Sequence, residues 1–399
     1  MGLLGMYSSA NLGDTAIQAV VLAALRKRRP DIEFIGVSHD PDDVARTYGI
    51  PGFPASGCGV MAFPEGEGCA ACSTGARAVK DASQATLLRR ILALPNVDRL
   101  VKSLDMLIVS GGGQIEDFWG GAWQQPLRLL SWCASARLRG KPTAGFALGV
   151  DELRTRLGIF FSIRALNTMR YLSFRDAGSL QFLNREGLSA AAAVCPDPAF
   201  GYAVPAPIER EASAGRFAVI SPMSVDAFPA MSTAHYDTYL TRLAAAADGL
   251  LRQGIAVRFA CSQTSMDPRV VLRVMSRMAS ADQAINVEVR TVDDFLRTVH
   301  GAELVITSRL HGTILSLAVH APVIAVSNAR KTARLMSDLS LQDYCLGVKD
   351  LQEDTLQSRV QEVIAGSRHL SGQIADRLVE LRQQLEFAFD DLARAVPVL

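Results

Sequence analysis

Short apolar runs alternate with longer amphipathic segments along the whole chain, and this alternation limits the fold more than any other feature. An apolar run of about four to eight residues is typical of a strand that helices cover on both faces, as in parallel sheets. The pattern predicts an α/β protein with parallel sheets. The expected strands are Leu3–Tyr7, Ile32–Ser38, Met106–Ser110, Thr143–Val150, Tyr171–Phe174 and Ala192–Cys195, followed by Phe217–Ser221, Ile255–Ala260, Val287–Arg290, Leu304–Thr307 and Val323–Val326.

The length of 399 residues exceeds the usual size of one hydrophobic core and predicts two domains. A stretch rich in proline, alanine and charge, Pro205 to Gly215, separates the two sets of strands and reads as a linker. We expect one Rossmann-like domain at residues 1–204 and a second at residues 216–370. Residues 371–399 are rich in helix formers, and we expect a helix there that crosses back to the first domain.

The charges of the chain almost cancel, with 41 basic residues against 40 acidic ones. No global field draws such a chain onto nucleic acid, so any anion site must be local. The first residues lack the charged start of a signal peptide, and the apolar run Ile314–Val326 is shorter than the roughly 20 residues of a membrane helix. We expect a cytoplasmic protein and leave open whether it lies at the inner face of the membrane.

The seven cysteines do not form the pattern of a disulfide framework. Cys69-Ala-Ala-Cys72, with Cys58 nearby, could be half of a zinc site or a redox pair, but there is no second pair of this kind. A reduced, irregular loop is the simpler interpretation, and we assign no metal. The surrounding segment from Gly49 to Gly75 is expected to be a long loop that acts as a lid.

Asn11-Leu12-Gly13-Asp14 follows the first expected strand and opens a helix that extends to Arg28. Small residues let a ligand approach the backbone closely, and the free amides at a helix start favour anions. In the alternative interpretation, Asn11 and Asp14 only cap the helix, which is the usual role of these residue types.

Three consecutive glycines, Gly111-Gly112-Gly113, follow the strongly apolar strand that ends at Ser110. Ligands in open α/β sheets bind at the carboxyl ends of strands, and three glycines are costly to order unless a ligand must come close to the backbone. Asp117 then lies at the floor of the site, where it could transfer a proton or orient a hydroxyl group.

Arg175 follows the expected strand Tyr171–Phe174 and precedes Asp176. The planar guanidinium in this position matches a carboxylate or a phosphate. A surface salt bridge is the default alternative for Arg175, and a helix cap is the alternative for Asp176.

The strongest motif is Ser308-Arg309-Leu310-His311, which follows the strand Leu304–Thr307 and opens an apolar helix. Arg309 and His311 are thereby placed at a helix N-terminus, where the backbone already favours negative charge. The two side chains could hold one anion from two sides. A lone histidine is usually structural, but here an arginine, a histidine and Gly312 share one turn between strand and helix.

Together these motifs, with Asp197-Pro198, resemble the polysaccharide pyruvyltransferase family in order and spacing from residue 2 to about residue 345. The resemblance implies two Rossmann-like domains of the glycosyltransferase-B type whose parallel sheets face a central cleft. It further implies phosphoenolpyruvate as the donor, a saccharide as the acceptor, and no cofactor beyond the donor substrate.

The resemblance also assigns roles to individual residues. Catalysis would fall to His311, Asp117 and Arg309. Donor binding would involve Arg175, Ser308, Arg309, Leu310 and His311, and the cleft would be lined by Asn11, Gly13, Asp14, Gly111, Gly112 and Gly113. The acceptor could be lipid-linked, polymeric or free.

Two other functions remain open from the sequence. One is a glycosyltransferase of the same fold that uses a nucleotide sugar, and the other is a sugar-binding member of a polysaccharide assembly complex without catalytic activity. The basic run Arg26-Lys27-Arg28-Arg29 fits the end of a helix, where positive charge complements the helix dipole; a contact with the membrane periphery is the less favoured alternative. The oligomeric state, including a homo-oligomer, is likewise open.

Overall fold

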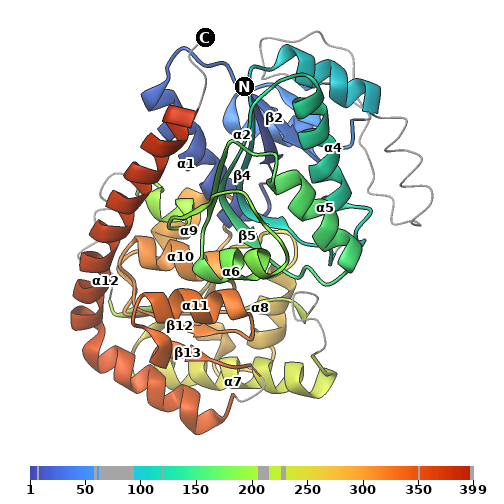
Figure 1. Cartoon of the computed structure of the whole chain (residues 1–399). Coiled ribbons are helices and arrows are strands. Elements are labelled where there is room, and N and C mark those ends of the chain that lie inside the picture. Colours follow the sequence, from blue (N-terminus) through green and yellow to red (C-terminus); the bar gives the residue numbers. More distant parts are fainter. Residues whose placement is uncertain are drawn as a thin grey trace. The chain divides into compact units, whose positions relative to one another are not determined.

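Two parallel sheets, each flanked by helices, organise the chain in the computed structural model (Figure 1). The structure describes residues 1–6, 9–57, 61–62, 94–118, 120–204, 215–225, 231–348 and 351–395. The first unit comprises Met1–Ser9, Ile17–Pro198 and Gln384–Leu399, and the second comprises Ala10–Ala16 and Ala199–Gln383. The α/β class with parallel sheets is therefore confirmed.

Within the described residues, the first unit holds seven parallel strands in the order β3-β2-β1-β4-β5-β6-β7. The strand order reverses between β1 and β4, and at such a point the connections diverge and leave room for a ligand at the carboxyl ends. The strands are β1 (Gly2–Met6), β2 (Ile35–Ser38), β3 (Gly52–Pro54), β4 (Leu107–Ile115), β5 (Thr143–Val150), β6 (Tyr171–Phe174) and β7 (Ala193–Val194).

Helices cover both faces of this first sheet (Figure 1). One face packs against α1 and the end of α12, and the opposite face packs against α4, α5 and the helical residues 94–103. The helices of this unit are α1 (Leu12–Arg28, from Ile17), α2 (Pro41–Tyr48), α4 (Gln125–Leu138), α5 (Arg156–Leu166), α6 (Ala177–Arg185) and the last part of α12 (Glu353–Ala395, from Gln384).

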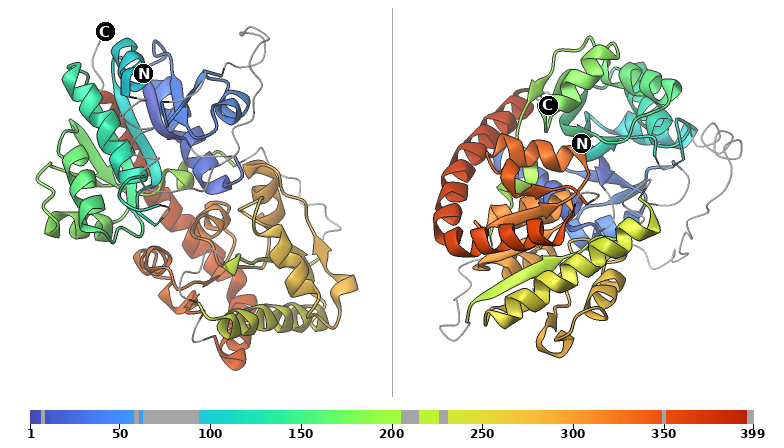
Figure 2. Two further views of the ribbon diagram at one scale, coloured as in Figure 1. Left: turned by 90° about the vertical axis from the view of Figure 1, so that its right-hand side faces the viewer. Right: turned by 90° about the horizontal axis from the view of Figure 1, so that it is seen from below.

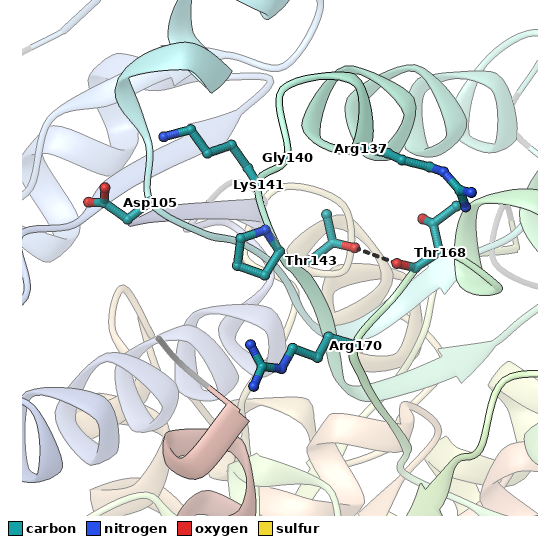
Figure 3. A pocket seen from close by; sticks show the side chains of 8 residues that line it. Asp105, Arg137, Gly140, Lys141, Thr143, Thr168 and Arg170 are labelled. Atoms are coloured by element: carbon teal, nitrogen blue, oxygen red, sulfur yellow. Dashed lines mark hydrogen bonds between the residues drawn. The ribbon is translucent and has the colours of Figure 1, made fainter. Parts of the chain in front are cut away.

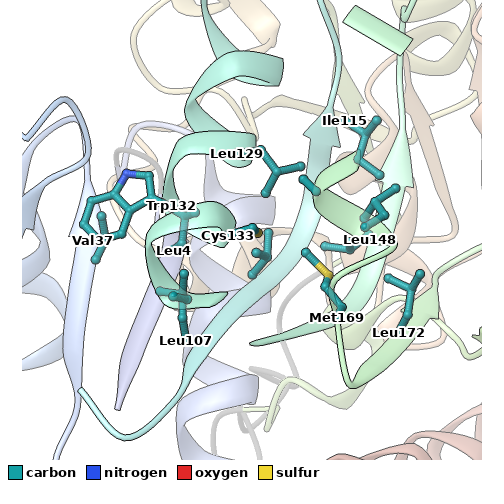
Figure 4. Close-up of a cluster of buried hydrophobic side chains, with 14 of the residues drawn as sticks. Leu4, Val37, Leu107, Ile115, Leu129, Trp132, Cys133, Leu148, Met169 and Leu172 are labelled. Carbon is teal, nitrogen blue, oxygen red and sulfur yellow. The ribbon is translucent and has the colours of Figure 1, made fainter. Parts of the chain in front are cut away.

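One hydrophobic core of the first unit lies between its sheet and the helices on the α4 side (Figure 4). Trp132 of α4 is 1% exposed and packs edge-to-face against Phe53, with ring centroids 6.0 Å apart. The indole nitrogen of Trp132 donates a hydrogen bond to the carbonyl oxygen of Ala55 at 3.1 Å, which satisfies its polar group inside the core. This contact fixes β3, a strand of only three residues, at the edge of the sheet.

The end of α12 packs on the opposite face of the first sheet. Phe389 is 2% exposed and stacks on Phe146 of β5, with centroids 4.7 Å apart. Arg28 donates hydrogen bonds to Asp390 at 2.6 Å and to Glu386 at 2.8 Å. The helix begins at Glu353, well before the expected helical segment, and has 43 residues. Among the described residues, neither α12 nor any other helix is long and apolar enough to cross a membrane.

The second unit holds six parallel strands among its described residues, in the order β10-β9-β8-β11-β12-β13. The order reverses between β8 and β11. Helices α7 and α8 lie on one face, with α10 and α11 on the other (Figure 2). The elements are β8 (Phe217–Ser221), α7 (Thr233–Arg252), β9 (Ala256–Phe259), α8 (Pro268–Met275), β10 (Ile285–Asn286), α9 (Val292–Val299), β11 (Leu304–Thr307), α10 (Leu310–Ala318), β12 (Val323–Val326), α11 (Arg330–Asp338) and β13 (Cys345–Leu346).

Several strands differ from the sequence prediction. The expected strand Val287–Arg290 is wrong, because the ladder ends where the Val287 amide bonds to Phe259, and the Arg290 amide turns to the Asp294 carboxylate that caps α9. The short edge strands β3 and β13 were not predicted. The lid and the cysteines at 58, 69 and 72 lie largely or wholly outside the described residues, as does the linker at 205–214.

Phe389→Ala should lower the free energy of unfolding of the first unit by about 3–5 kcal/mol, because it leaves a cavity against Phe146. Phe387→Ala is the matched control: Phe387 lies on the same helix and is 70% exposed, so its loss should change stability by less than about 0.5 kcal/mol. Urea denaturation followed by circular dichroism measures both. Equal effects of the two substitutions would contradict the packing described for the end of α12.

Candidate functional site

The turn after β11 lies where the second sheet reverses its strand order. Arg309 is the N-cap residue of α10, with φ −97° and ψ 139°, and its side chain makes no capping hydrogen bond. The first amides of a helix have no partner within the helix and carry partial positive charge. His311 is half-buried in the first turn of α10. This end of α10 is therefore suited to an anion.

A buried carboxylate fixes the orientation of Arg309. Its Nε donates to Asp267 at 2.6 Å and its Nη2 donates to the same carboxylate at 2.8 Å. The Asp267 side chain is fully buried and also accepts a hydrogen bond from the Ser224 amide at 3.0 Å, whereas the Arg309 side chain keeps 21% of its surface exposed. Among the described residues no acceptor engages Nη1, which leaves that nitrogen for a ligand.

Asp267 was not predicted as a site residue. It precedes Pro268 at the start of α8, a pattern that indicates a helix cap, but its side chain makes no capping hydrogen bond there. The carboxylate turns instead to Arg309, 42 positions later in the chain. No local sequence signal indicates such a pair, because both residues also fit ordinary roles at helix starts.

The segment that opens α1 lies against the same turn. A Cβ atom placed on Gly13 would overlap the His311 ring, so only glycine leaves space for the imidazole in this position. The Leu12 amide donates to the Ser262 carbonyl at 3.1 Å, and the Thr264 amide donates to the Ala10 carbonyl at 2.9 Å. The structure thus brings together two of the predicted motifs that are about 300 residues apart in the sequence, through the loop that follows β9.

Asn11 and Asp14 are joined to each other. The Asn11 side chain accepts from the Gly13 amide at 3.2 Å through Oδ1 and donates to the Asp14 carboxylate at 2.6 Å through Nδ2. The capping alternative is therefore confirmed for Asn11. The same contacts hold the half-buried Asp14 carboxylate at the start of α1, in the unit that contains His311.

Ser308 supports the turn from inside. It is 3% exposed, and its hydroxyl shares a 2.7 Å hydrogen bond with the hydroxyl of Tyr239. Burial raises the pKa of Tyr239 and that of the nearby Cys261 thiol well above their ordinary values, so both groups are neutral. Leu310 is half-buried beside Arg309. Contacts of Ser308 and Leu310 with a donor remain predictions.

In the first unit the strand does not end at Ser110, which corrects the expected position of the three glycines after the strand. They continue β4, and the register shifts between Gly112 and Ile115. Gly111 has φ +39° and Gly112 has φ +75°, values that other residues rarely adopt, so the glycines permit a bulge at the end of the strand. A Cβ atom on Gly113 would overlap the Asp151 carboxylate.

Asp117 is buried by its own chain, with 6% of its surface exposed. Its carboxylate accepts hydrogen bonds from the amides of Arg154 at 2.9 Å and Thr155 at 2.7 Å, and from the Thr155 hydroxyl at 2.6 Å. This geometry connects the end of β4 to the start of α5. Its role in catalysis remains a prediction.

Arg175 lies inside the first unit rather than open to solvent. The side chain is 5% exposed and donates through Nη1 to Asp197, also 5% exposed, at 3.1 Å. Burial alone would lower the pKa of the guanidinium, but nearby carboxylates outweigh this effect and raise the pKa above its ordinary value. These carboxylates belong to Asp197, Asp151 and Asp176. The surface salt bridge, which was the alternative for Arg175, is therefore wrong, because the ion pair is buried, whereas a contact of Arg175 with the donor remains a prediction.

A depression of about 660 Å³ lies at the opposite, amino edge of the first sheet (Figure 3). Arg137, Lys141 and Arg170 surround it, and the Thr143 hydroxyl donates to the Thr168 carbonyl at 3.3 Å. Helices of a parallel sheet end at this edge, where basic residues complement the helix dipoles. The depression contains none of the predicted site residues, so we do not assign the candidate site to it.

A family model of polysaccharide pyruvyl transferases matches residues 11–330. The chain belongs to the polysaccharide pyruvyl transferase family. The matched region begins at Asn11 and includes both Asp117 and the Arg309–His311 turn, so the resemblance inferred from the joint motifs is confirmed. None of the curated proteins compared with the chain matches it significantly.

Solved structures share the fold of this pyruvyl transferase family member at low sequence identity. S. aureus MnaA in a co-structure with UDP has a TM-score of 0.59 at 12% identity, with 94% of this chain and 89% of that chain covered. UDP-GlcNAc 2-epimerase from Neisseria meningitidis bound to UDP-GlcNAc has a TM-score of 0.59 at 10% identity, covering 99% of both chains. A glycosyltransferase from Rickettsia africae ESF-5 has a TM-score of 0.55 at 11% identity, covering 98% of both. The glycosyltransferase-B-like fold is thereby confirmed.

Gly13→Ala should lower the free energy of unfolding by about 1–3 kcal/mol, because the methyl group displaces the His311 ring. Gly366→Ala is the control, for which we expect a higher free energy of unfolding. Gly366 lies within α12, and a methyl group added there would have no neighbouring atom within 4 Å. Alanine should therefore stabilise the helix by roughly 0.5–1 kcal/mol. Thermal denaturation measures both. A stable Gly13→Ala protein would contradict the contact with His311.

Asp197→Ala should lower the free energy of unfolding by about 3–5 kcal/mol, because it leaves the Arg175 guanidinium buried without its bonded carboxylate. Asp31→Ala removes the carboxylate of an exposed pair with Arg29 in the same unit and should have little effect, since water screens that pair. Denaturation curves of both variants provide the comparison. If the two substitutions cost the same, Arg175 is not held as described.

Proposed function

We propose that the protein transfers the enolpyruvyl group of phosphoenolpyruvate to a saccharide and forms a pyruvate ketal, in the biosynthesis of a cell-surface polysaccharide or exopolysaccharide. The observation that carries the proposal is the arrangement of Arg309 and His311 at the uncapped start of α10, in a chain of the polysaccharide pyruvyl transferase family. We place the reaction in the cytoplasm, on an acceptor that is either free, polymeric or lipid-linked.

The donor carries a phosphate and a carboxylate, and the start of α10 offers donors for both kinds of group. The guanidinium of Arg309 is held in one plane by Asp267, so its free Nη1 meets an oxyanion without further loss of side-chain freedom. The first amides of α10 add further hydrogen-bond donors. We assign no cofactor and no metal, because these groups supply the positive charge that the donor requires.

The reaction requires a group that donates one proton to the donor substrate. It also requires that the protons of two saccharide hydroxyl groups be accepted. In the proposed route His311 protonates the methylene carbon of phosphoenolpyruvate, which leaves positive charge on the carbon that carries the phosphate. A saccharide hydroxyl attacks that carbon and loses its proton, phosphate leaves with its bonding electron pair, and a second hydroxyl closes the ketal as its proton is lost. The products are the ketal and inorganic phosphate, and fixed positive charge from Arg309 stabilises the developing anion.

The roles proposed from the sequence for Asp117 and Arg175 have less support than that for His311. Asp117 would act as the base, but three hydrogen bonds from its own chain already occupy its oxygens. Arg175 would contact the donor, but it is 5% exposed and paired with Asp197. Both residues could still act through the positions of α5 and of the strand ends that they hold.

We expect His311→Ala to retain the fold and to lower turnover by about 100-fold or more, because the proton donor is lost.

Arg309→Lys should raise the KM for phosphoenolpyruvate by about tenfold. A lysine cannot donate two parallel hydrogen bonds to the Asp267 carboxylate and also present a further donor to the substrate. Inorganic phosphate release measures both rates, and mass spectrometry of an acceptor mixture incubated with phosphoenolpyruvate identifies the ketal. Full activity of His311→Ala would contradict its role.

The second candidate function is that of a glycosyltransferase that uses a nucleotide sugar. It is favoured by the fold shared with the UDP-bound MnaA and with the epimerase bound to UDP-GlcNAc. The decisive comparison is thermal stabilisation by phosphoenolpyruvate against a panel of UDP- and GDP-sugars. Stabilisation by a nucleotide sugar but not by phosphoenolpyruvate would reverse our choice.

Phosphate release that depends on the acceptor would exclude the third function, that of an assembly-complex member without catalytic activity.

A further inference from the structure

Helix α5 is apolar on the side that faces away from the core. It lies in the outer layer of the first unit (Figure 1). Its inner residues Ile163 and Leu166 are buried, at 8% and 0% exposure, as expected for a helix that covers a sheet. On the other side Leu157 is 38% exposed and Phe160 is 49% exposed. A helix on the surface of a protein normally has polar side chains opposite its buried stripe, so this face departs from the usual pattern.

The outward apolar side chains form one continuous group. Leu157, Phe160, Phe161 and Arg164 are spaced by three and four residues, which places them on one side of a helix. The rings of Phe160 and Phe161 are 6.0 Å apart, and Phe161 meets Trp123 at 5.8 Å. The Arg164 guanidinium lies 5.2 Å from the centre of the Phe160 ring. We call this group, with Trp123, the α5 patch.

The charge on α5 is entirely positive. The helix contains Arg156 and Arg164 and no acidic residue. Arg154, just before the helix, is 66% exposed and pairs with Glu152 at 2.6 Å. Aromatic rings beside arginines are the side chains that enter the boundary between lipid head groups and acyl chains, where arginine binds anionic head groups.

We propose that the α5 patch docks on a lipid bilayer that carries anionic lipids. A second copy of the chain fits the patch less well, because a symmetric contact would bring Arg156 and Arg164 of two copies together without an acid on the helix to neutralise them. An anionic bilayer accepts the rings and supplies the missing negative charge. The proposal goes beyond the proposed reaction and does not depend on it.

The position of the patch connects the bilayer with the carboxyl edge of the first sheet. The Asp117 carboxylate binds the amides that lead into α5, and a Cβ atom on Gly158 of α5 would come within van der Waals overlap of the same carboxylate. The end of β4 and the patch are thus adjacent parts of one unit. A bilayer at α5 would hold this edge close to the membrane surface, where a lipid-linked saccharide is found.

Sedimentation of the full chain with lipid vesicles tests the proposal. The vesicles consist either of phosphatidylcholine alone or of phosphatidylcholine mixed with phosphatidylglycerol. We expect the wild type to bind the anionic vesicles, and Phe160→Ser to lower the partition coefficient by about tenfold or more, because the ring no longer leaves water. Phe387→Ser is the matched control, since Phe387 is 70% exposed on α12 and should bind like the wild type.

The charge reversal Arg156→Glu with Arg164→Glu keeps the apolar residues and tests the electrostatic part separately. This double variant should have a partition coefficient on anionic vesicles that is lower by about fivefold or more per arginine. Its remaining binding should no longer depend on the salt concentration. Failure of the wild type to bind anionic vesicles would overturn the proposal, as would an equal loss in Phe387→Ser. Sedimentation analysis that finds a dimer dissociated by Phe160→Ser would assign the patch to a second copy instead. Circular dichroism confirms that each variant is folded.

Discussion

The carboxylate of Asp267 is the group on which the candidate site depends. It is fully buried, and it is compensated by two donors from Arg309 and one from the Ser224 backbone. A buried carboxylate without these partners would be costly, so the side chain and the turn after β11 fix each other's positions. The loop that ends at Asp267 also binds the backbone of Ala10 and Leu12. One loop therefore sets the place of both the arginine and the segment that packs against His311.

Each unit pairs an arginine with a carboxylate near the carboxyl ends of its strands, but the two pairs differ in exposure. The side chains of Arg175 and Asp197 are both 5% exposed, so their opposite charges compensate each other inside the first unit. Arg309 keeps 21% of its side chain exposed while its partner is fully buried. Only the second arrangement holds an arginine rigidly and still leaves part of its guanidinium for a ligand, and this is why Arg309 carries the proposal rather than Arg175.

The sequence predicted the features that depend on local pattern. The strands Thr143–Val150, Leu304–Thr307 and Val323–Val326 have the predicted ends, because buried parallel strands are largely apolar and these three are bounded by polar residues or proline. The reversal of strand order and the pairing of Asp267 with Arg309 depend on contacts across the fold. The path of the chain at Gly111–Gly113 also depends on contacts across the fold. Three glycines permit positive φ angles, but the pairing with β5 decides that the chain continues as a bulged strand.

Glycines determine where the polar side chains of these motifs can lie. The space that a Cβ atom would need on Gly13 is taken by His311, on Gly149 by the Arg175 guanidinium, and on Gly158 by the Asp117 carboxylate. In each case the glycine belongs to a different element from the side chain that it accommodates. A glycine at such a position in this chain therefore reports the position of a distant charged or aromatic group as much as the local path of the backbone. Gly13 is an example of this role: because it has no side chain, it leaves the space that the imidazole of His311 occupies.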